Sequence, residues 1–197
     1  MKIVLATHNR DKIKEFKNKL SLADIILLSL DDFPDLPETI EDGVTLEQNS
    51  LKKAKEIFEF TGLPSIADDT GLLVEVLNGE PGVYSARYAG ENATYRDNCE
   101  KLLLALKDTT NRASKFSTVI TFYYADNKYV QVKGELEGNI AYSFTGENGF
   151  GYDPIFYVTE LSKSLGELTL EQKNRISHRA KAIEAIIPHL LKFSKLT

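Results

Sequence analysis

The order of a short apolar strand and an amphipathic helix at the start of the chain constrains the fold more than any other feature. Residues 2–7 form an apolar, β-branched run that predicts a buried strand. After a polar turn, Ile13, Phe16 and Leu20 recur at helical spacing between lysines. A strand that leads through a polar turn into a helix is typical of α/β proteins. The N–H groups at such a helix start can hold an anion.

Further periodic segments predict more strands and helices. We expect strands in the residue ranges 24–30, 65–71, 72–77, 116–125 and 129–136, the last two as a hairpin. Thr70-Gly71 is interpreted as a corner between two short strands. We expect helices at 45–60, 94–106 and 170–191, with Thr45 as an N-cap and Pro188 kinking or fraying the last turns. No linker or repeat divides the chain, so we expect a single domain over residues 1–197.

Composition excludes several classes of partner. The chain has 29 acidic and 24 basic residues, a net charge of −5, which argues against binding to a nucleic acid polymer. The apolar run at the N-terminus is too short for a signal peptide, and no stretch of about 18 apolar residues could span a bilayer. We therefore expect a cytoplasmic protein with no membrane partner. The single cysteine, Cys99, is interpreted as structural.

Two adjacent aspartates are the strongest candidates for a metal site. Asp68 and Asp69 end an apolar run, and adjacent carboxylates repel each other unless a cation compensates. Successive side chains of a regular strand point to opposite faces, so both can reach one site only if the strand ends at Thr70-Gly71. The alternative is an exposed Asp-Asp turn. Glu41 lies in a separate acidic loop and offers a further oxygen ligand.

Three other segments offer groups that could bind an anion or a flat ligand. The turn from Thr7 to Lys12 carries hydroxyl, amide and ammonium donors at a helix start. In Gly149-Phe150-Gly151-Tyr152-Asp153-Pro154 the glycines permit close backbone approach, and Phe150 could stack on a ring or lie in the core. The basic residues near the last helix form either a solvated face or a phosphate clamp: Lys173, His178 and Arg179.

Six blocks, in order along nearly the whole chain, resemble the inosine triphosphate pyrophosphatase family, also called the XTP/dITP diphosphatases. The blocks are Ala6 to Lys12 with Glu15, Glu41 to Thr45 with Asn49 and Lys53, Ala67 to Leu72, Pro81 to Tyr88, Gly149 to Pro154, and Ile176 to Arg179. The resemblance implies an α/β fold with a central mixed sheet flanked by helices, and two lobes with the active site in the cleft between them. It also implies a homodimer and a Mg2+-dependent hydrolysis of the nucleoside triphosphates ITP, dITP and XTP to the monophosphate and pyrophosphate.

The same resemblance assigns roles to individual residues. Glu41, Asp68 and Asp69 would bind Mg2+, and Asp69 would activate the attacking water. Phe150 would stack on the purine. The remaining substrate contacts would come from Thr7, His8, Asn9, Arg10, Asp11, Lys12, Lys53, Thr70, Gly151, Tyr152, Asp153, Lys173, His178 and Arg179.

Selectivity would follow from the base edge, because hypoxanthine and xanthine carry a 6-oxo acceptor where adenine carries an amino donor. His8 and Gln48 depart from residues common in the family at those positions. Three other interpretations compete: a Maf-like enzyme acting on pyrimidine or modified nucleotides, a nucleotide-binding regulator without catalysis, and a structural domain. The retained acids and lysines and the last two blocks favour the purine enzyme.

Overall fold

The computed structural model describes residues 1–20 and 25–195, which form two compact units. Unit 1 comprises Met1–Asp69, Thr118–Gly134 and Arg179–Thr197, and unit 2 comprises Thr70–Ser117 and Glu135–His178. Three strands contribute residues to both units. The single domain expected over 1–197 stays a prediction.

The described strands form a mixed sheet in the order β2-β1-β3-β5-β6-β7-β8, with β4 paired to β3. Their bounds are β1 Lys2–Leu5, β2 Ile26–Leu28, β3 Ser65–Val74, β4 Pro81–Gly82, β5 Ala113–Ala125, β6 Lys128–Ile140, β7 Phe156–Val158 and β8 Lys163–Ser164. Strand β1 is parallel to β2 and β3, whereas β4 is antiparallel to β3 and β7 is antiparallel to β6 and β8. The expected α/β fold with a mixed sheet is confirmed.

The described α-helices are α1 Arg10–Leu20, α2 Leu46–Thr61, α3 Tyr95–Ala105, α4 Leu170–Ile176 and α5 His178–Ser194. Short 3-10 helices occur at Leu30–Asp32, Glu75–Leu77, Ser85–Arg87, Asp153–Ile155, Thr159–Leu161 and Leu165–Glu167. Side chains cap the first turns of several helices, as expected from the sequence. Thr45 accepts a hydrogen bond from the Gln48 N–H at 3.2 Å, and Thr94 and Asp97 form a capping box at α3.

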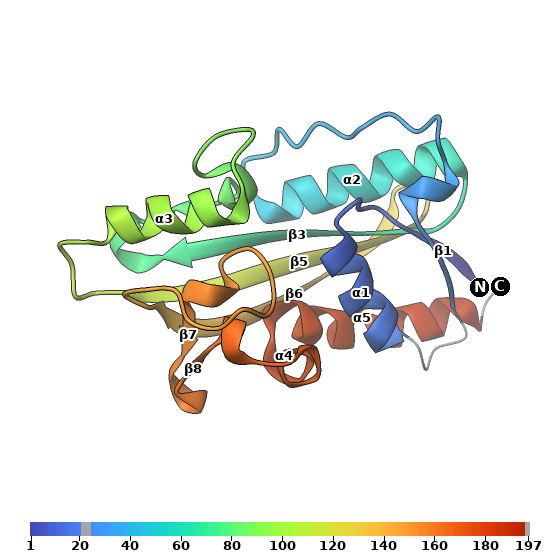
Figure 1. Cartoon of the computed structure of the whole chain (residues 1–197). Coiled ribbons are helices and arrows are strands. Elements are labelled where there is room, and N and C mark those ends of the chain that lie inside the picture. Colours follow the sequence, from blue (N-terminus) through green and yellow to red (C-terminus); the bar gives the residue numbers. More distant parts are fainter. Residues whose placement is uncertain (21–24, 196–197) are drawn as a thin grey trace. The chain divides into compact units, whose positions relative to one another are not determined.

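In unit 1, helices cover both faces of the strands (Figure 1). Helices α1 and α5 pack on one face, where Ile3, Leu5 and Ile66 meet Phe16 and Ile183. Helix α2 packs on the other face. Its contribution is Ala54 and Ile57, which meet Val4, Ala67 and Tyr123. The alternation along β1, with Ile3 and Leu5 on one face and Val4 on the other, makes both faces apolar.

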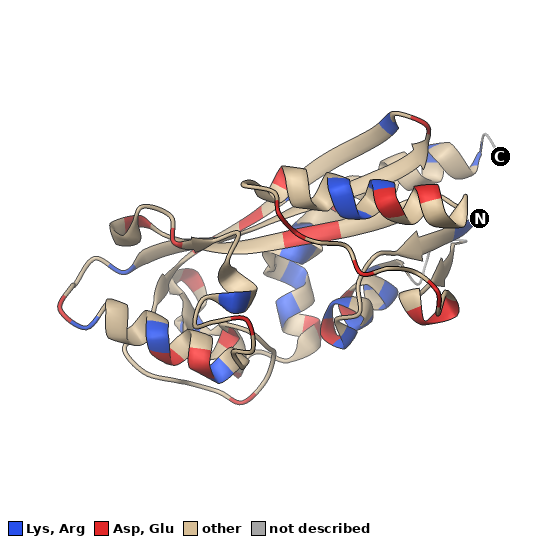
Figure 2. Ribbon diagram, turned by 90° about the horizontal axis from the view of Figure 1, so that it is seen from above, with Lys and Arg blue, Asp and Glu red and all other residues tan. Residues whose placement is uncertain are grey.

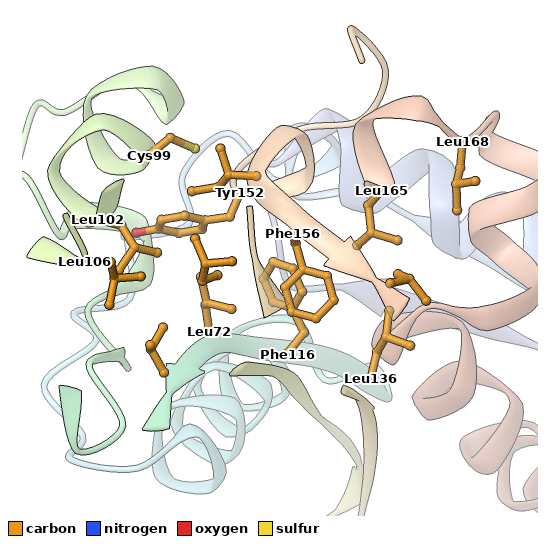
Figure 3. Close-up of a cluster of buried hydrophobic side chains, with 14 residues drawn as sticks. Leu72, Cys99, Leu102, Leu106, Phe116, Leu136, Tyr152, Phe156, Leu165 and Leu168 are labelled. Atoms are coloured by element: carbon orange, nitrogen blue, oxygen red, sulfur yellow. The ribbon is translucent and has the colours of Figure 1, made fainter. Parts of the chain in front are cut away.

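Unit 2 has its own apolar core, drawn in Figure 3. Helix α3 supplies Cys99 and Leu102, its C-cap is Leu106, and strands β3, β5 and β6 supply Leu72, Phe116 and Leu136 among others. Tyr152 and Phe156 come from the glycine-rich segment and the strand that follows it. This core fixes the backbone on both sides of residues 149–155.

Four sequence predictions require correction. Residues 65–74 form one continuous strand, so the corner expected at Thr70-Gly71 is wrong. The hairpin strands are longer than expected, at 113–125 and 128–140. The predicted strand at 24–30 is reduced to Ile26–Leu28, and Asp24 lies outside the described residues.

The C-terminal helix is also divided at a different place from the one expected. Ser177 adopts an extended conformation, with φ −64° and ψ 153°, and separates α4 from α5. Pro188 lies inside α5, which continues to Ser194, so the helix does not fray at Pro188, and the alternative expectation of a kink stays a prediction. The break at Ser177 places His178 and Arg179 at the first two positions of α5.

Acidic and basic residues are interspersed along the ribbon of both units (Figure 2). None of the helices in the described ranges is both long enough and apolar enough to cross a membrane.

Candidate functional site

The turn between β1 and α1 is held by its own side chains. The Thr7 hydroxyl accepts from the Asn9 N–H at 3.1 Å. The Asn9 Oδ1 accepts from the N–H groups of Asp11 at 3.0 Å and Lys12 at 3.2 Å, which is the geometry of a helix N-cap. Two of the residues predicted to hold phosphates therefore also shape the start of α1.

A buried chain of charges connects α1, β3 and α5 in unit 1. Asp68 Oδ2 lies 3.0 Å from Lys12 Nζ and accepts from Arg179 Nε at 3.1 Å. Arg179 Nη1 donates to Glu15 Oε2 at 2.5 Å. The side chains of Glu15, Asp68 and Arg179 are almost fully buried. Ion pairs in this environment require their partners, because an unpaired buried charge is costly.

The ionisation of these buried groups follows from their burial and from the alternation of positive and negative charges among them. Burial alone would raise the pKa of Asp68, but Lys12 and Arg179 hold it well below its usual range. Burial lowers the pKa of Lys12, although Asp68 acts in the opposite direction. Burial opposes the charge on Arg179 too, yet Asp68 and Glu15 raise the pKa of the guanidinium. Asp68 is thus an ionised carboxylate between two cations.

A second cluster connects α2, β3 and the acidic loop. Lys53 Nζ lies 3.0 Å from Glu41 Oε1 and 3.4 Å from Asp69 Oδ1. Asn49 Nδ2 donates to Asp69 Oδ2 at 3.2 Å. Asn49 and Lys53 are four residues apart, so they share one face of α2. The helix thereby presents an amide and an ammonium to the same carboxylate.

The pKa directions in this second cluster differ from those around Asp68. Burial is the main reason that the pKa of Asp69 is raised, and Glu41 adds to the effect while Lys53 opposes it. Burial disfavours the charged form of Lys53, but Asp69 and Glu41 together raise its pKa. Asp69 is therefore a more basic carboxylate than Asp68, its neighbour in sequence.

Asp68 and Asp69 leave opposite faces of β3. The strand continues through both residues to Val74, so successive side chains alternate between the faces. Asp68 contacts residues of α1 and α5, and Asp69 contacts residues of α2. Electrostatic coupling remains, because Lys53 lowers the pKa of Asp68 and Lys12 lowers that of Asp69. The strand end expected at Thr70-Gly71, which would have brought both side chains to one site, is absent, so a metal site shared by Asp68 and Asp69 stays a prediction.

In unit 2, three residues of the predicted site meet around one carboxylate. Asp153 Oδ2 accepts from Lys173 Nζ at 2.7 Å and from the Phe150 N–H at 2.8 Å. Lys173 Nζ lies 4.3 Å from the centre of the Phe150 ring. Gly149 has φ 78°, and a Cβ there would lie 2.1 Å from Asp153 Oδ2, so only glycine fits.

The basic residues 173, 178 and 179 are buried rather than solvated. Lys173 and His178 are each 3% exposed and Arg179 is 2% exposed. The interpretation as a solvated face is wrong for all three. The partners of Lys173 and Arg179 lie far away in the sequence, because Asp153 is 20 positions from Lys173 and Glu15 is 164 positions from Arg179.

The glycine-rich segment divides between the core and the surface. Tyr152 is buried and donates its hydroxyl to the Ser85 carbonyl at 2.9 Å, and burial raises its pKa. Phe150 is only half-buried and lies outside the apolar core, so the alternative of a core Phe150 is wrong. Gly151 has φ 61° and accepts from Cys99 Sγ through its carbonyl at 3.4 Å.

Other residues predicted to contact substrate lie nearer the surface. His8 is exposed, and its Nδ1 lies 3.9 Å from Asp31 Oδ1. Arg10 is exposed, whereas Asp11 and Thr70 are half-buried. Their substrate contacts stay predictions.

Glu15 and Asn49 were matched to the family pattern without a role, and the structure shows what each does. Glu15 is the second carboxylate of Arg179, and Asn49 holds Asp69. Asn49 also accepts from the Gly43 N–H through its Oδ1 at 2.8 Å, which ties the acidic loop to α2. The sequence contained some indication of these roles. Each residue is polar, and its spacing along the helix places it beside apolar residues or lysines.

The oxygen atoms of the predicted metal site suit a hard divalent cation. Glu41 and Asp69 both contact Lys53 Nζ, and the charge of Glu41 helps to raise the pKa of Asp69. A cation would relieve that repulsion. Within residues 1–20 and 25–195 no three His, Cys, Asp or Glu side chains gather as a ready metal site. One or two carboxylates together with phosphate oxygens are the usual ligands of Mg2+, so the residues fit a metal that arrives with a phosphate.

Comparison with known proteins identifies the family of the chain. The model of the Ham1 family matches residues 3–189. A dITP/XTP pyrophosphatase of Desulfotalea psychrophila is 45% identical over 97% of this chain and 87% of its own length. A dITP/XTP pyrophosphatase of Thermoanaerobacter sp. is 48% identical over 98% of both chains. The solved structure of the Staphylococcus aureus Ham1 protein has a TM-score of 0.89 and 42% identity, covering 98% of this chain and 99% of its own.

The family resemblance inferred from the six sequence blocks is thus confirmed by matches that extend over almost the whole chain. Both the family model and the relatives cover the acids, lysines and aromatic residues described above. The chain belongs to the Ham1 family.

Proposed function

We propose that the chain is a hydrolase that converts the non-standard purine nucleoside triphosphates ITP, dITP and XTP to the monophosphate and pyrophosphate. The observation that carries the proposal is the pair of buried charge clusters on β3, in which Lys12, Arg179 and Lys53 face Asp68 and Asp69. A triphosphate requires several cations and a base near one another. The names of the relatives, dITP/XTP pyrophosphatases, support the same reaction.

The phosphates are held by the residues around the start of α1 and by α2. Thr7, Asn9 and Lys12 lie in the turn whose N–H groups begin the helix, and Lys53 comes from α2. Before substrate arrives the lysines are neutralised by Asp68, Asp69 and Glu41. The polyanion replaces part of that pairing, so the cations need no large rearrangement to hold it.

Glu41, Asp68 and Asp69 hold Mg2+ in this proposal. Bound there, the metal supplies positive charge that offsets the charge of the phosphates. Mg2+ demands oxygen ligands and binds few protein groups when phosphate is present, which agrees with the small number of carboxylates.

Asp69 is the base that accepts a proton from the attacking water. Its pKa is raised mainly by burial, so its carboxylate is a stronger proton acceptor than an exposed aspartate. Asn49 and Lys53 hold the two carboxylate oxygens and so fix the direction in which the base faces. Asp68 lies beside two cations that keep its pKa low, and a strongly stabilised carboxylate is a poor base.

Residues of unit 2 recognise the base. Phe150 stacks on the purine, with Lys173 and Asp153 in fixed contact with it and with each other. His178, the last residue of unit 2, contributes donors from the start of α5, and it is followed by Arg179 of unit 1. Donors that face the 6-oxo group accept hypoxanthine and xanthine and leave the amino group of adenine without a partner.

The proposal has two further parts. The chain acts in the cytoplasm, as expected from the sequence, and it acts as a homodimer, as the family resemblance implies. Light scattering of the purified chain over a range of concentrations tests the second part, since a monomer at every concentration contradicts it.

The deciding experiment is pyrophosphate release with Mg2+ from ITP, dITP, XTP, GTP, ATP and UTP, with EDTA controls. We expect strong turnover of the first three and loss of that turnover in EDTA. A preference for UTP or modified pyrimidines would indicate a Maf-like enzyme instead. Tight binding of ITP without turnover would indicate a regulator.

A further inference from the structure

Three buried rings form a stack in unit 2 that ends on His178. The imidazole of His178 lies 4.4 Å from the ring of Phe116 between centroids, with an angle of 21° between the planes. Phe116 also contacts Phe156, at 4.6 Å and with a tilt of 41°, and Figure 3 shows these two phenylalanines against each other. All three side chains are at most 6% exposed.

The backbone on both sides of His178 is held by secondary structure, because α5 begins at this residue and α4 ends just before it. Ser177 is extended and separates α4 from α5, and its N–H donates to the Lys173 carbonyl at 2.9 Å. This bond fixes where the His178 Cα lies, but it does not fix the plane of the imidazole. The torsion that turns a histidine ring has broad minima, so the groups packed against the ring help to set its plane. The nearly parallel ring of Phe116 is one such group.

The plane of an imidazole decides where its nitrogen atoms point, because both lie in the plane of the ring. A hydrogen bond weakens steeply when its angle falls below about 120°. A rotation of the ring by a few tens of degrees would therefore misdirect a bond to a flat base.

We propose that Phe116 is a positioning residue that aims the His178 imidazole at the purine base. The inference rests on the proposed function, since it assumes that His178 contacts the base. Phe116 itself does not touch the substrate. It acts from β5 through its ring contact with His178, so its effect is confined to substrates that carry a base.

The first arm of the test measures the stack directly. The chain has three histidines, at positions 8, 178 and 189, so labelling of the histidine ring carbons gives three resolvable NMR signals. We expect the ring proton signals of His178, assigned with His178→Gln, to lie upfield of those of exposed His8 because of the Phe116 ring current. Phe116→Leu should abolish this shift, and Phe116→Tyr should retain it. An unchanged His178 signal in Phe116→Leu overturns the proposal.

The second arm measures the consequence for the reaction. We expect Phe116→Leu to lower kcat/KM for ITP by about tenfold and to leave the inhibition constant of inorganic triphosphate within about twofold of the wild type. Phe116→Tyr should restore kcat/KM. Phe122→Leu is the matched control, because Phe122 is a buried phenylalanine of the same strand in the core of unit 1. It creates a similar cavity and should leave both constants unchanged.

The outcomes separate this proposal from the proposed function. Wild-type chain that releases no pyrophosphate from ITP contradicts the proposed function itself. If the wild type is active but Phe116→Leu weakens ITP and inorganic triphosphate equally, or if Phe122→Leu has the same effect as Phe116→Leu, only the positioning role is overturned.

Discussion

The guanidinium of Arg179 and the carboxylate of Asp68 are 111 residues apart in sequence and 3.1 Å apart between Nε and Oδ2. Arg179 also binds Glu15, so one buried cation is shared by two buried carboxylates. This sharing joins the last helix of the chain to the first helix and to β3. The site is therefore stable only when the N-terminal and C-terminal segments of unit 1 are both in place.

Replacement of Arg179 by methionine should lower the free energy of unfolding by about 3–5 kcal/mol, because it removes the buried cation that the carboxylates of Glu15 and Asp68 share, although Asp68 keeps Lys12. Arg175→Met is the matched control. Arg175 is an exposed arginine that pairs with Glu171 one turn away, and such a pair contributes about 0.3–0.5 kcal/mol. Urea unfolding followed by circular dichroism measures both. Equal losses in the two variants would contradict the stabilising role of the buried network.

The stability of the chain should depend on pH through Asp68. Its folded-state pKa lies well below the ordinary value of 3.8, so its contribution is fully present above that value and is lost as pH falls below it. We expect the difference in unfolding free energy between the wild type and Asp68→Asn, measured in EDTA, to be constant from pH 7 to about pH 5 and to shrink below about pH 4. A difference that stays constant down to pH 3 would show that Asp68 is not held in its ionised form.

The local sequence pattern predicts the helices and strands of this fold well where a single periodicity of apolar residues dominates a segment. The helical spacing of Ile13, Phe16 and Leu20 and the N-cap at Thr45 each describe neighbours within a few residues, and both are confirmed. Gly71 shows the limit of predictions that use only neighbouring residues. The glycine was interpreted as a corner, but it lies within β3, where a Cβ would approach the Gly82 carbonyl oxygen to 2.7 Å. The need for glycine comes from β4, which the local sequence does not describe.

The site shows the same limit for polar residues. A lysine or arginine beside an apolar helix face looks the same in sequence whether it is solvated or buried with a distant partner. Lys173 and Arg179 are buried because Asp153, Asp68 and Glu15 come to them from other elements. Only the resemblance of the whole set of blocks predicted that these residues act together, and their individual roles stay predictions.

Cys99 should be inert in the folded chain. Its pKa is raised to about 12, first by burial and then by the charge of Asp153, and only the thiolate reacts. At pH 8 we expect a chromogenic disulfide reagent to label native protein at least about a hundredfold more slowly than protein unfolded in urea. Complete labelling of the native chain within the mixing time would contradict this prediction, as would a loss of activity on brief treatment with the reagent.

Asp69→Asn should reduce kcat for ITP by roughly 10²- to 10⁴-fold, because an amide cannot accept the proton of the attacking water. The change is nearly isosteric and retains the hydrogen-bonding distance to Asn49, so the far-ultraviolet circular dichroism spectrum should not change. Asp126→Asn is the control, as Asp126 is an exposed residue of the hairpin turn. Wild-type turnover in Asp69→Asn would show that another group activates the water.

Phe150→Ala should weaken binding of ITP by about 1–3 kcal/mol, the usual contribution of an aromatic ring stacked on a base. Inorganic triphosphate lacks a base, so its inhibition constant should change much less. Phe150 also lies against Lys173, 4.3 Å from the ammonium to the ring centre, and some loss at the phosphates could enter through that lysine. Phe150→Leu separates the two effects, because leucine keeps apolar bulk beside Lys173 but cannot stack. Tyr142→Ala, at an exposed aromatic residue of the same unit, is the control and should change neither constant. If Phe150→Leu binds ITP as the wild type does, the ring supports Lys173 and does not hold the base.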